Sequence, residues 1–255
     1  MSAVAGVVEY NLRTYRRTWR GSVFGMLLSP MVFLVAMGIG LGSLINRRSG
    51  GVEGVPYLLF LAPGLLVANA MQSSLFLTTY TTLSRVRWQR TYEAMLATPV
   101  RVRDLVTGEL AWVTFRMLQG ACVFWVAMAL FGTVRSPAGV LAVPVAVLTG
   151  LAFACPIMAF SATQRSDVGF ILLQRLVMVP LFLFGGVFFP LDRLPLPLQA
   201  LAWAAPLPHG VVLARGLTLG TLSPGSAWPH LAVLAAYAGG GALAAWVTLR
   251  RRLER

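Results

Sequence analysis

Long hydrophobic runs alternate along this chain with short polar connections that are rich in arginine. Each run is long enough, or nearly so, for a helix of about 20 residues to cross a bilayer. The pattern therefore predicts an all-α membrane protein with six transmembrane helices and no soluble domain. The predicted spans lie within residues 21–46, 54–84, 106–131, 136–164, 168–185 and 228–249.

Two segments do not fit a simple span. Residues 1–20 are too polar to cross a membrane, but their apolar side chains recur every three or four positions and leave the arginines on the other face. This pattern predicts an interfacial helix on the membrane surface, or more simply a basic anchor. Residues 187–225 are apolar but contain six prolines, a density that excludes a regular lipid-facing helix.

The arginines indicate how the chain is oriented. All 21 basic residues are arginine, and the net charge is +13. With a cytoplasmic N-terminus, the inside segments 1–20, 84–106, 161–167 and 250–255 carry four, five, one and four arginines, 14 in all. The outside segments 46–56, 133–137 and 187–225 carry two, one and two, 5 in all. Because arginine-rich loops stay in the cytoplasm, both termini are predicted to be cytoplasmic.

The absence of lysine excludes one important class of function. A P-loop needs a lysine to reach the phosphates of ATP, so this chain cannot hydrolyse ATP through a motif of its own. The two histidines are far apart in sequence, and the cysteines and carboxylates lack the spacing of metal ligands, so no metal site is expected. No nucleophile motif indicates an enzyme. An ion-coupled secondary transporter and a non-transporting scaffold remain as alternatives to an ATP-driven function.

Two motifs resemble a known family. They are "RTYEAMLATPVRVRDLVTGEL" after the second span and "GGVFFPLDRLPLPLQALAWAAPLPHGVVLARGL", residues 185–217, before the last. With the six-span layout, they resemble the permease subunits of ABC-2 type exporters over nearly the whole chain, so residues 1–255 are expected to form one transmembrane domain. The nearest branch holds the nodulation lipo-oligosaccharide exporters and the daunorubicin-type drug exporters.

The resemblance implies a role and partners. Permeases of this family pair as dimers, with an identical or a sister chain, and associate with two separate ATPase subunits. ATP and Mg²⁺ would bind to those subunits, and this chain would bind no cofactor. The expected function is export of an amphiphile, which could be a drug, a lipid or a lipo-oligosaccharide, from the cytoplasm or inner leaflet across a bacterial plasma membrane.

The first cytoplasmic loop, residues 85–105, is implied to couple the permease to the ATPase. We expect a helix over 85–97 that ends before Pro99, because the residue before a proline is pushed out of the helical region. Thr98 should cap the next helix, with Pro99 at its first position. The candidate coupling residues are Arg87, Arg90, Tyr92, Glu93, Met95, Leu96 and Pro99. In this interpretation Val86, Tyr92, Met95 and Leu96 face the membrane or the partner, and Arg85, Arg87, Arg90 and Glu93 face water. The alternative is a loop that only binds anionic headgroups.

The remaining candidate residues lie in the substrate path. Residues 187–225 are expected to form a re-entrant pair of short helices, "LPLQALAWA" and "HGVVLARGL", in which His209 and Arg215 hold the helices together or meet a polar headgroup. This segment could be a gate or a fixed plug. Glu109, Arg116 and Arg175 lie inside predicted spans, where each charge needs a partner or a wet cavity. We predict that Glu109 pairs with Arg165 or Arg175, that Arg116 faces the dimer cavity, and that Arg175 could instead reach the cytoplasmic surface.

Overall fold

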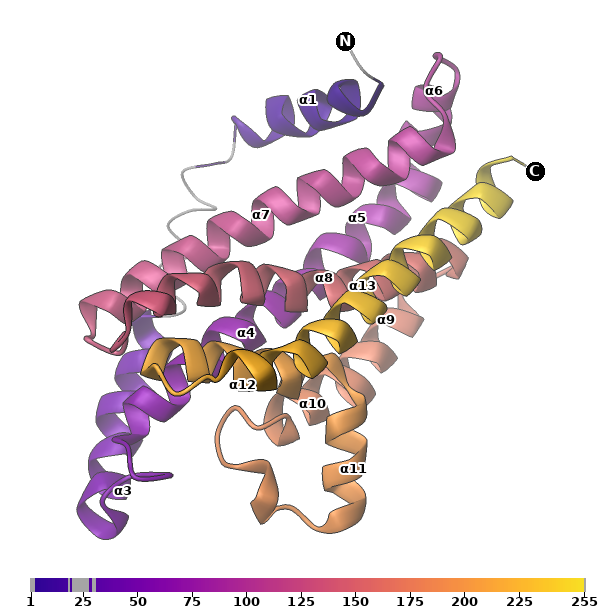
Figure 1. The fold of residues 1–255 in the computed structure, drawn as a ribbon. Helices are drawn as coiled ribbons and strands as arrows, with labels where there is room; N and C mark the ends of the chain where they lie inside the picture. The colour runs from indigo at the N-terminus through magenta and orange to yellow at the C-terminus, as the bar shows by residue number, and fades with distance from the viewer. Residues whose placement is uncertain (1–2, 18, 20–27, 29–30, 255) are drawn as a thin grey trace.

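The chain folds into a bundle of long helices, which Figure 1 shows in the computed structural model. The structure describes residues 3–17, 19, 28 and 31–254, and within them no β-strand forms. The first half contains α1 (Ala3–Tyr15), η1 (Leu34–Leu41), α3 (Gly42–Ser49), α4 (Tyr57–Thr78), α5 (Tyr80–Leu83), η2 (Ser84–Trp88), α6 (Thr91–Leu96) and α7 (Val102–Leu130). The second half contains η3 (Pro137–Leu141), α8 (Ala142–Thr163), α9 (Val168–Leu173), η4 (Gln174–Met178), α10 (Val179–Phe184), η5 (Leu191–Arg193), α11 (Leu196–Ala204), α12 (Pro206–Leu219) and α13 (Pro224–Leu253).

Five helices of the described residues are long and apolar enough to cross a membrane. They are Met31–Arg48, Tyr57–Trp88, Val102–Leu130, Pro137–Thr163 and Pro224–Leu253. Five of the six predicted spans therefore have a counterpart. The predicted fifth span is a shorter apolar helix, Val168–Phe184, that ends at Gly185 as expected. Part of the predicted first span, residues 21–27 and 29–30, lies outside the described residues.

Helix α8 is the centre of the bundle, with α4 and α13 packed along it. It is apolar throughout and mostly buried, as expected for a helix covered on several sides. Gly241 of α13 allows this close packing, because a Cβ atom there would lie 2.4 Å from Cδ of Pro156 in α8. A larger residue at this position would force the two helices apart.

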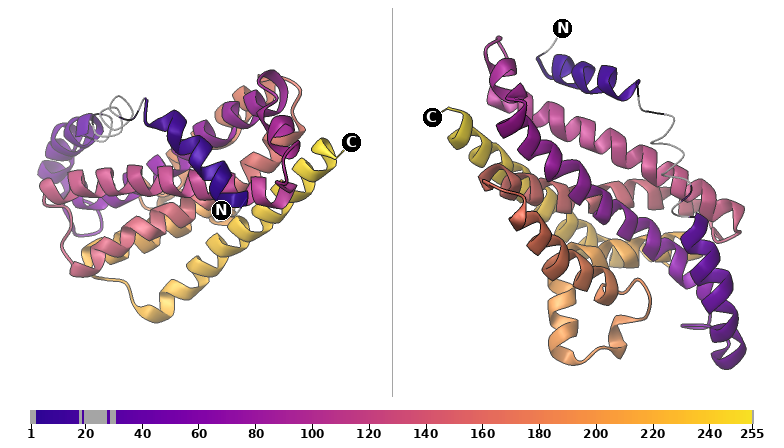
Figure 2. Two further views of the ribbon diagram at one scale, coloured as in Figure 1. Left: turned by 90° about the horizontal axis from the view of Figure 1, so that it is seen from above. Right: turned by 180° about the vertical axis from the view of Figure 1, so that it is seen from behind.

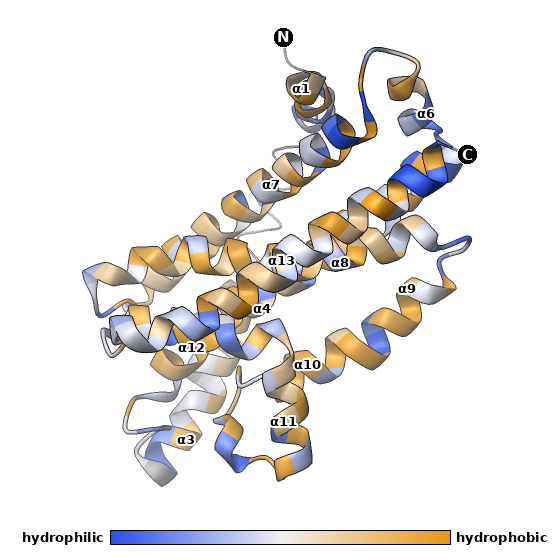
Figure 3. Cartoon of the chain, turned by 45° about the vertical axis from the view of Figure 1, so that its right-hand side comes forward, coloured by the Kyte–Doolittle hydropathy of each residue, from blue (hydrophilic) through white to orange (hydrophobic). Residues whose placement is uncertain are grey.

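The segments that the arginine count assigned to the cytoplasm come together at one end of the bundle. Helix α6, the start of α1 and the C-terminal end of α13 lie there in every view (Figures 1 and 2). The side chain of Arg87 donates to the carbonyl of Arg165, and Nη1 of Arg252 donates to the carbonyl of Gln164 at 3.0 Å. Figure 3 shows hydrophilic residues concentrated at this end, beyond the apolar middle of the long helices.

The three segments assigned to the other side also meet. The backbone N–H of Arg135, in the loop after α7, donates to the carbonyl of Thr218 in α12 at 2.9 Å. The hydroxyl of Tyr57, which follows the first outer loop, donates to the carbonyl of Phe188 at 3.3 Å. Two sets of loops that are distant in sequence are thus separated onto opposite ends of the bundle, as the arginine count predicted.

Helix α1 lies along the first half of α7 (Figure 1). Gly108 makes this contact possible, because a Cβ atom there would lie 2.7 Å from Cβ of Val7. Val7 and Asn11 are buried against α7, whereas Leu12 and Trp19 of the predicted apolar face remain exposed. The helix is therefore amphipathic, but one of its buried positions is the polar Asn11.

Residues 187–225 form two short helices, as expected. Helix α11 has the predicted bounds, Leu196–Ala204, because Pro195 and Pro197 favour a helix start and Ala205 precedes Pro206 in an extended conformation. Helix α12 includes the whole second predicted segment and begins three residues earlier, at Pro206. The two helices meet at an angle of 84°.

Candidate functional site

A buried ion pair lies beneath the predicted coupling segment. Nη1 of Arg85, at the end of the second span, contacts Oε1 of Glu109 in α7, and the two side chains are only 12% and 4% exposed. Asn11 of α1 completes the cluster: its amide donates to Glu109 at 3.3 Å, and its oxygen accepts from Arg85. Because a buried charge is costly unless it is paired and hydrogen-bonded, this cluster joins α1, η2 and α7 strongly.

The predicted partner of Glu109 was wrong. Neither Arg165 nor Arg175 pairs with it; Arg175 is exposed on η4, and Arg165 contributes its carbonyl to Arg87. The reason is the length of the second span, which continues as helix to Trp88. Arg85 therefore lies at the end of the second span beside α7, where its side chain is only 12% exposed, and the prediction that Arg85 faces water was also wrong.

Tyr92 is the residue of α6 that is anchored in this cluster. Its side chain is only 1% exposed, and its hydroxyl interacts with Arg85 and Thr82. Burial, and next the negative charge of Glu109, raises the pKa of Tyr92, so the phenol stays neutral. The expectation that Tyr92 faces the membrane or a partner was wrong, and so was the same expectation for Val86, which is buried in the core.

The predicted coupling segment, residues 85–105, contains a break in its helix at a position that the sequence did not indicate. Arg90 adopts a left-handed conformation, with φ of 50°, between η2 and α6, so residues 85–97 are not one helix. Helix α6 ends before Pro99, as predicted. However, Thr98 does not cap the next helix, because its hydroxyl donates to the carbonyl of Met95 at 2.6 Å. Helix α7 begins later, at Val102, where Asp104 accepts from the backbone N–H of Arg101 at 3.1 Å.

The face of this segment that points away from the bundle is exposed and polar. Arg87, Arg90 and Glu93 all project from the bundle, and the Glu93 side chain is 57% exposed. Trp88 beside them is 67% exposed and adds an apolar group to this surface. Met95 and Leu96 are half-buried and pack against the core, whereas Pro99 is exposed in the turn after α6. Buried side chains thus fix the segment, and charged ones together with Trp88 cover its surface.

Arg116 has partners within the chain. Its guanidinium lies over the ring of Tyr15 in α1, with 4.3 Å to the centroid, and Nη1 donates to Gln119 at 3.1 Å. The Tyr15 hydroxyl donates to the same Gln119 oxygen at 2.8 Å. The expected need for a partner is therefore met by α1 and α7. Whether Arg116 also faces a cavity between two permeases stays a prediction.

At the other end, His209 joins three helices. Its Nε2 atom lies 2.9 Å from the carbonyl of Trp203 in α11, and its Nδ1 atom lies 2.8 Å from Nδ1 of His230 in α13. Since a carbonyl only accepts, Nε2 of His209 donates to it, and in the neutral imidazole Nδ1 then accepts from His230. The prediction that His209 holds the two short helices together agrees with these contacts. His230 was not predicted, because 21 residues of sequence separate it from its partner. Within the described chain, no third histidine, cysteine or carboxylate joins the pair to form a metal site.

Arg215 holds α12 against the second span. Nε donates to the carbonyl of Phe60 at 3.1 Å, and Nη2 donates to the carbonyl of Gly186 at 2.9 Å. The guanidinium carbon also lies 3.6 Å from the centroid of the Phe60 ring, which is the geometry of a cation–π contact. Arg215 therefore fixes α12 to the second span and to the loop after α10, and not to α11 as predicted, and it lines a cavity at this end.

The comparison with protein families accounts for this combination of long helices and two polar ends. The model of the family described as "ABC-2 type transporter" matches residues 5–219. The chain belongs to the ABC-2 type transporter family. It is therefore a transmembrane permease subunit of an ABC transporter and a multi-pass membrane protein, of a family whose members are generally not catalytic themselves.

Curated relatives extend the match over almost the whole chain. Nodulation protein J of Rhizobium leguminosarum bv. viciae is 35% identical over 245 residues, which cover 96% of this chain and 93% of that protein. Nodulation protein J of Rhizobium meliloti (strain 1021) is 36% identical over 245 residues, 95% of this chain and 91% of that protein. The inner membrane transport permease YadH of Escherichia coli (strain K12) is 24% identical over 220 residues, with coverage of 86% and 83%.

Proposed function

We propose that this permease is the membrane half of an ATP-driven exporter that moves an amphiphile out of the cytoplasm or the inner leaflet. Two permease chains would pair, and two ATPase subunits would bind ATP and Mg²⁺ and drive the transport. The end of the bundle that carries α6 would lie in the cytoplasm of a bacterium, with both termini on that side of the plasma membrane. Helix α1 would lie at the inner membrane surface.

The single observation that carries this proposal is the construction of the coupling segment. An exposed polar surface that includes Arg87, Arg90 and Glu93 is attached to the bundle through the buried Tyr92, Arg85 and Glu109. A headgroup-binding loop needs only the exposed arginines. A segment that transmits force needs a rigid connection to the spans, and the ion pair and its hydrogen bonds provide one.

The opposite end supports a gate for the substrate. Helices α11 and α12 form a re-entrant hairpin in this proposal, because non-helical backbone is tolerated at membrane depth only where protein or a cavity surrounds it. His209 and Arg215 would keep this hairpin closed through contacts with α13 and the second span. Movement of either neighbour would then open it.

Helix Val168–Phe184 is the best candidate for the contact with the second permease or the substrate. Most of its residues are exposed, Phe170 and Met178 being the buried exceptions. Leu176 is 70% exposed, and an apolar groove of about 550 Å³ separates this helix from α8 and α11. An apolar face of this kind fits lipid, a second permease or the apolar part of an amphiphile.

The experiment that tests the proposal reverses one charge on the exposed face of α6. Glu93→Arg should abolish substrate stimulation of the ATPase in the assembled, reconstituted complex, because it reverses a charge on the surface proposed to contact the ATPase. The fold should not change, because Glu93 is exposed and makes only a 3.9 Å contact with Arg90. Glu254→Arg is the matched control, since Glu254 is an equally exposed carboxylate at the same end and pairs with Arg250. Normal stimulation in Glu93→Arg would contradict the coupling role. Flux driven by a proton gradient without ATPase would favour an ion-coupled carrier instead.

A further inference from the structure

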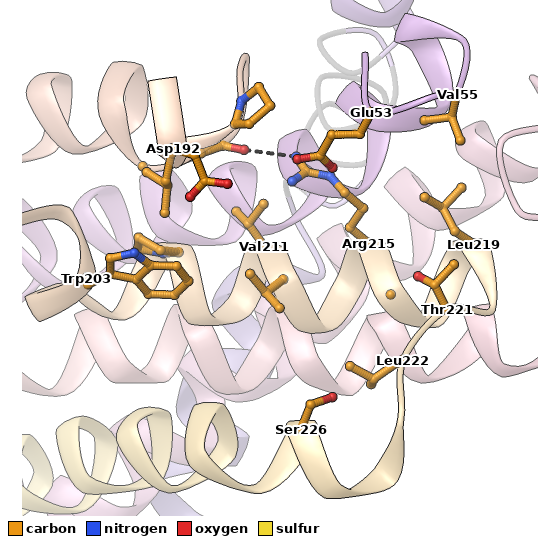
Figure 4. Close-up of a pocket in the computed structure, with 17 residues that line it drawn as sticks. Glu53, Val55, Asp192, Trp203, Val211, Arg215, Leu219, Thr221, Leu222 and Ser226 are labelled. Atoms are coloured by element: carbon orange, nitrogen blue, oxygen red, sulfur yellow. Dashed lines mark hydrogen bonds between the residues drawn. The ribbon is translucent and has the colours of Figure 1, made fainter. Parts of the chain in front are cut away.

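A cavity of about 410 Å³ lies at the end of the bundle opposite to α6. Three segments enclose it: the turn before α4, the loop between α10 and η5, and helices α11 and α12 with the loop that follows. Figure 4 shows Glu53, Asp192 and Arg215 around one side of the cavity and Trp203 and Val211 along the other. The cavity thus combines three charged groups with an apolar wall.

Arg215 supplies the one positive charge among the described residues that line this cavity; Glu53 interacts with it electrostatically, but no carboxylate lies within 4.0 Å of its guanidinium. The two carbonyl bonds and the stacking on Phe60 hold its guanidinium in one position, and the dashed line in Figure 4 marks the bond to Gly186. Arg215 is in none of the four ion pairs that link described residues. The guanidinium of Arg215 is half-buried and no carboxylate contacts it directly, so its remaining N–H donors can bind an anionic group.

The two negative charges lie nearer to the surface. Glu53 and Asp192 are both exposed, whereas Arg215 is half-buried beneath them. Glu53 adopts φ of 52° in a tight turn that Val52 and Val55 close through two backbone hydrogen bonds, of 2.9 and 3.1 Å. A left-handed conformation is costly for a residue other than glycine, and the closed turn maintains it. The turn therefore holds the Glu53 carboxylate at the rim of the cavity.

The positive charge thus lies deeper in the cavity and the two negative charges lie nearer to its opening, and this order indicates the kind of ligand. We propose that the cavity binds a zwitterionic headgroup, with its phosphate on Arg215 and its primary ammonium group between Glu53 and Asp192. In a phospholipid of this type, the phosphate lies closer to the acyl chains and the ammonium group closer to water, which is the order of the charges in the cavity. Trp203 and Val211 would contact the apolar part that follows the phosphate. Phosphatidylethanolamine is the simplest amphiphile with this chemistry.

The role of this site as the exit position of an exported amphiphile rests on the proposed function, but the binding itself does not. The test therefore measures binding alone, on the full-length permease in detergent without ATPase. Native mass spectrometry would compare the retention of phosphatidylethanolamine, phosphatidylcholine and phosphatidylglycerol with identical acyl chains. Phosphatidylcholine has the same charges without N–H donors, and phosphatidylglycerol has the phosphate without the cation. We expect phosphatidylethanolamine to bind most tightly and soluble phosphoethanolamine to displace it.

Variants assign the binding to individual groups. Glu53→Gln with Asp192→Asn should reduce phosphatidylethanolamine binding about threefold to tenfold and remove the preference over phosphatidylglycerol, because exposed ion pairs contribute modestly. Arg215→Gln should weaken the binding of all three lipids. Since both carboxylates are exposed, the double variant tests the site even if Arg215→Gln fails to fold, and Glu254→Gln at the opposite end is the control. Equal binding of the three lipids, no displacement by phosphoethanolamine, or an unchanged preference in the double variant would overturn the proposal.

Discussion

The ion pair between Arg85 and Glu109 allows a quantitative prediction. The two side chains are 12% and 4% exposed, so solvent screens their interaction very little. Glu109→Leu removes one partner and leaves the Arg85 charge buried, which typically costs about 3–5 kcal/mol. For a chain of this size, 1 kcal/mol shifts the unfolding midpoint by about 2–4 °C, so the expected decrease is about 6–20 °C.

The matched double variant separates a lost ion pair from lost packing. Arg85→Met with Glu109→Leu removes both charges and fills the space with apolar groups, a change that is often neutral or stabilising. We expect it to recover most of the midpoint lost in Glu109→Leu. Thermal unfolding of the full-length chain in detergent, followed by tryptophan fluorescence, measures all variants, with Glu93→Leu on the exposed face of α6 as the control.

Two outcomes would refute this reasoning. A Glu109→Leu variant as stable as the parent would mean that Arg85 reaches water easily and that the cluster is not buried. A double variant less stable than Glu109→Leu would mean that the two residues act independently. Recovery of stability in the double variant, combined with loss of ATPase stimulation, would show that the ion pair serves the connection of α6 to the spans more than the stability of the fold.

Other contacts give further predictions. Gly108→Leu should release α1 from α7, because its side chain would overlap Val7. Cross-linking between cysteines placed in the two helices should then decrease. Gly120→Leu, at an open position, should leave the cross-linking unchanged. His230→Phe should lower the free energy of unfolding by about 1–3 kcal/mol, since it leaves Nδ1 of His209 without its donor, and His230→Asn should restore much of this loss. Arg90→Pro should distort the start of α6 and abolish coupling, whereas Arg90→Gly should keep the left-handed conformation; equal activity of the two variants would contradict the importance of this bend.

The sequence pattern predicted those helices whose ends are determined by residues close to them in the sequence. The prolines at positions 195, 197 and 206 determine where α11 begins and ends, and its bounds agree with the prediction. The length of the apolar runs gave the long helices, and the arginine count separated the loops onto two ends. Each of these features depends on residues close in sequence or on the general cost of placing charge in lipid.

The contacts of the candidate site depend instead on how helices are aligned. Glu109 could have met any arginine near the cytoplasmic end, and the choice of Arg85 follows from the continuation of the second span to Trp88. His209 and His230 come together only because α12 and α13 cross at that level. Arg90 has no turn-forming neighbour in the sequence, so tertiary packing imposes its left-handed conformation. A single sequence contains no local signal for any of these.

The helix from Tyr57 to Trp88 connects the two ends of the molecule directly. An ideal α-helix of these 32 residues would extend over roughly 48 Å at 1.5 Å per residue; here Thr79 interrupts the span, and its last five residues form the π-helix η2. Near one end, the carbonyl of Phe60 holds Arg215; near the other, Arg85 anchors the coupling segment. The helix can therefore act as a lever, because a tilt of about 5° about one end displaces the other by about 4 Å, roughly the width of a hydrogen-bonded contact. Such a displacement is enough to break the hydrogen bonds of Arg215. A small rotation at α6 would therefore change the contacts of Arg215 at the far side of the membrane without any change within the helix itself.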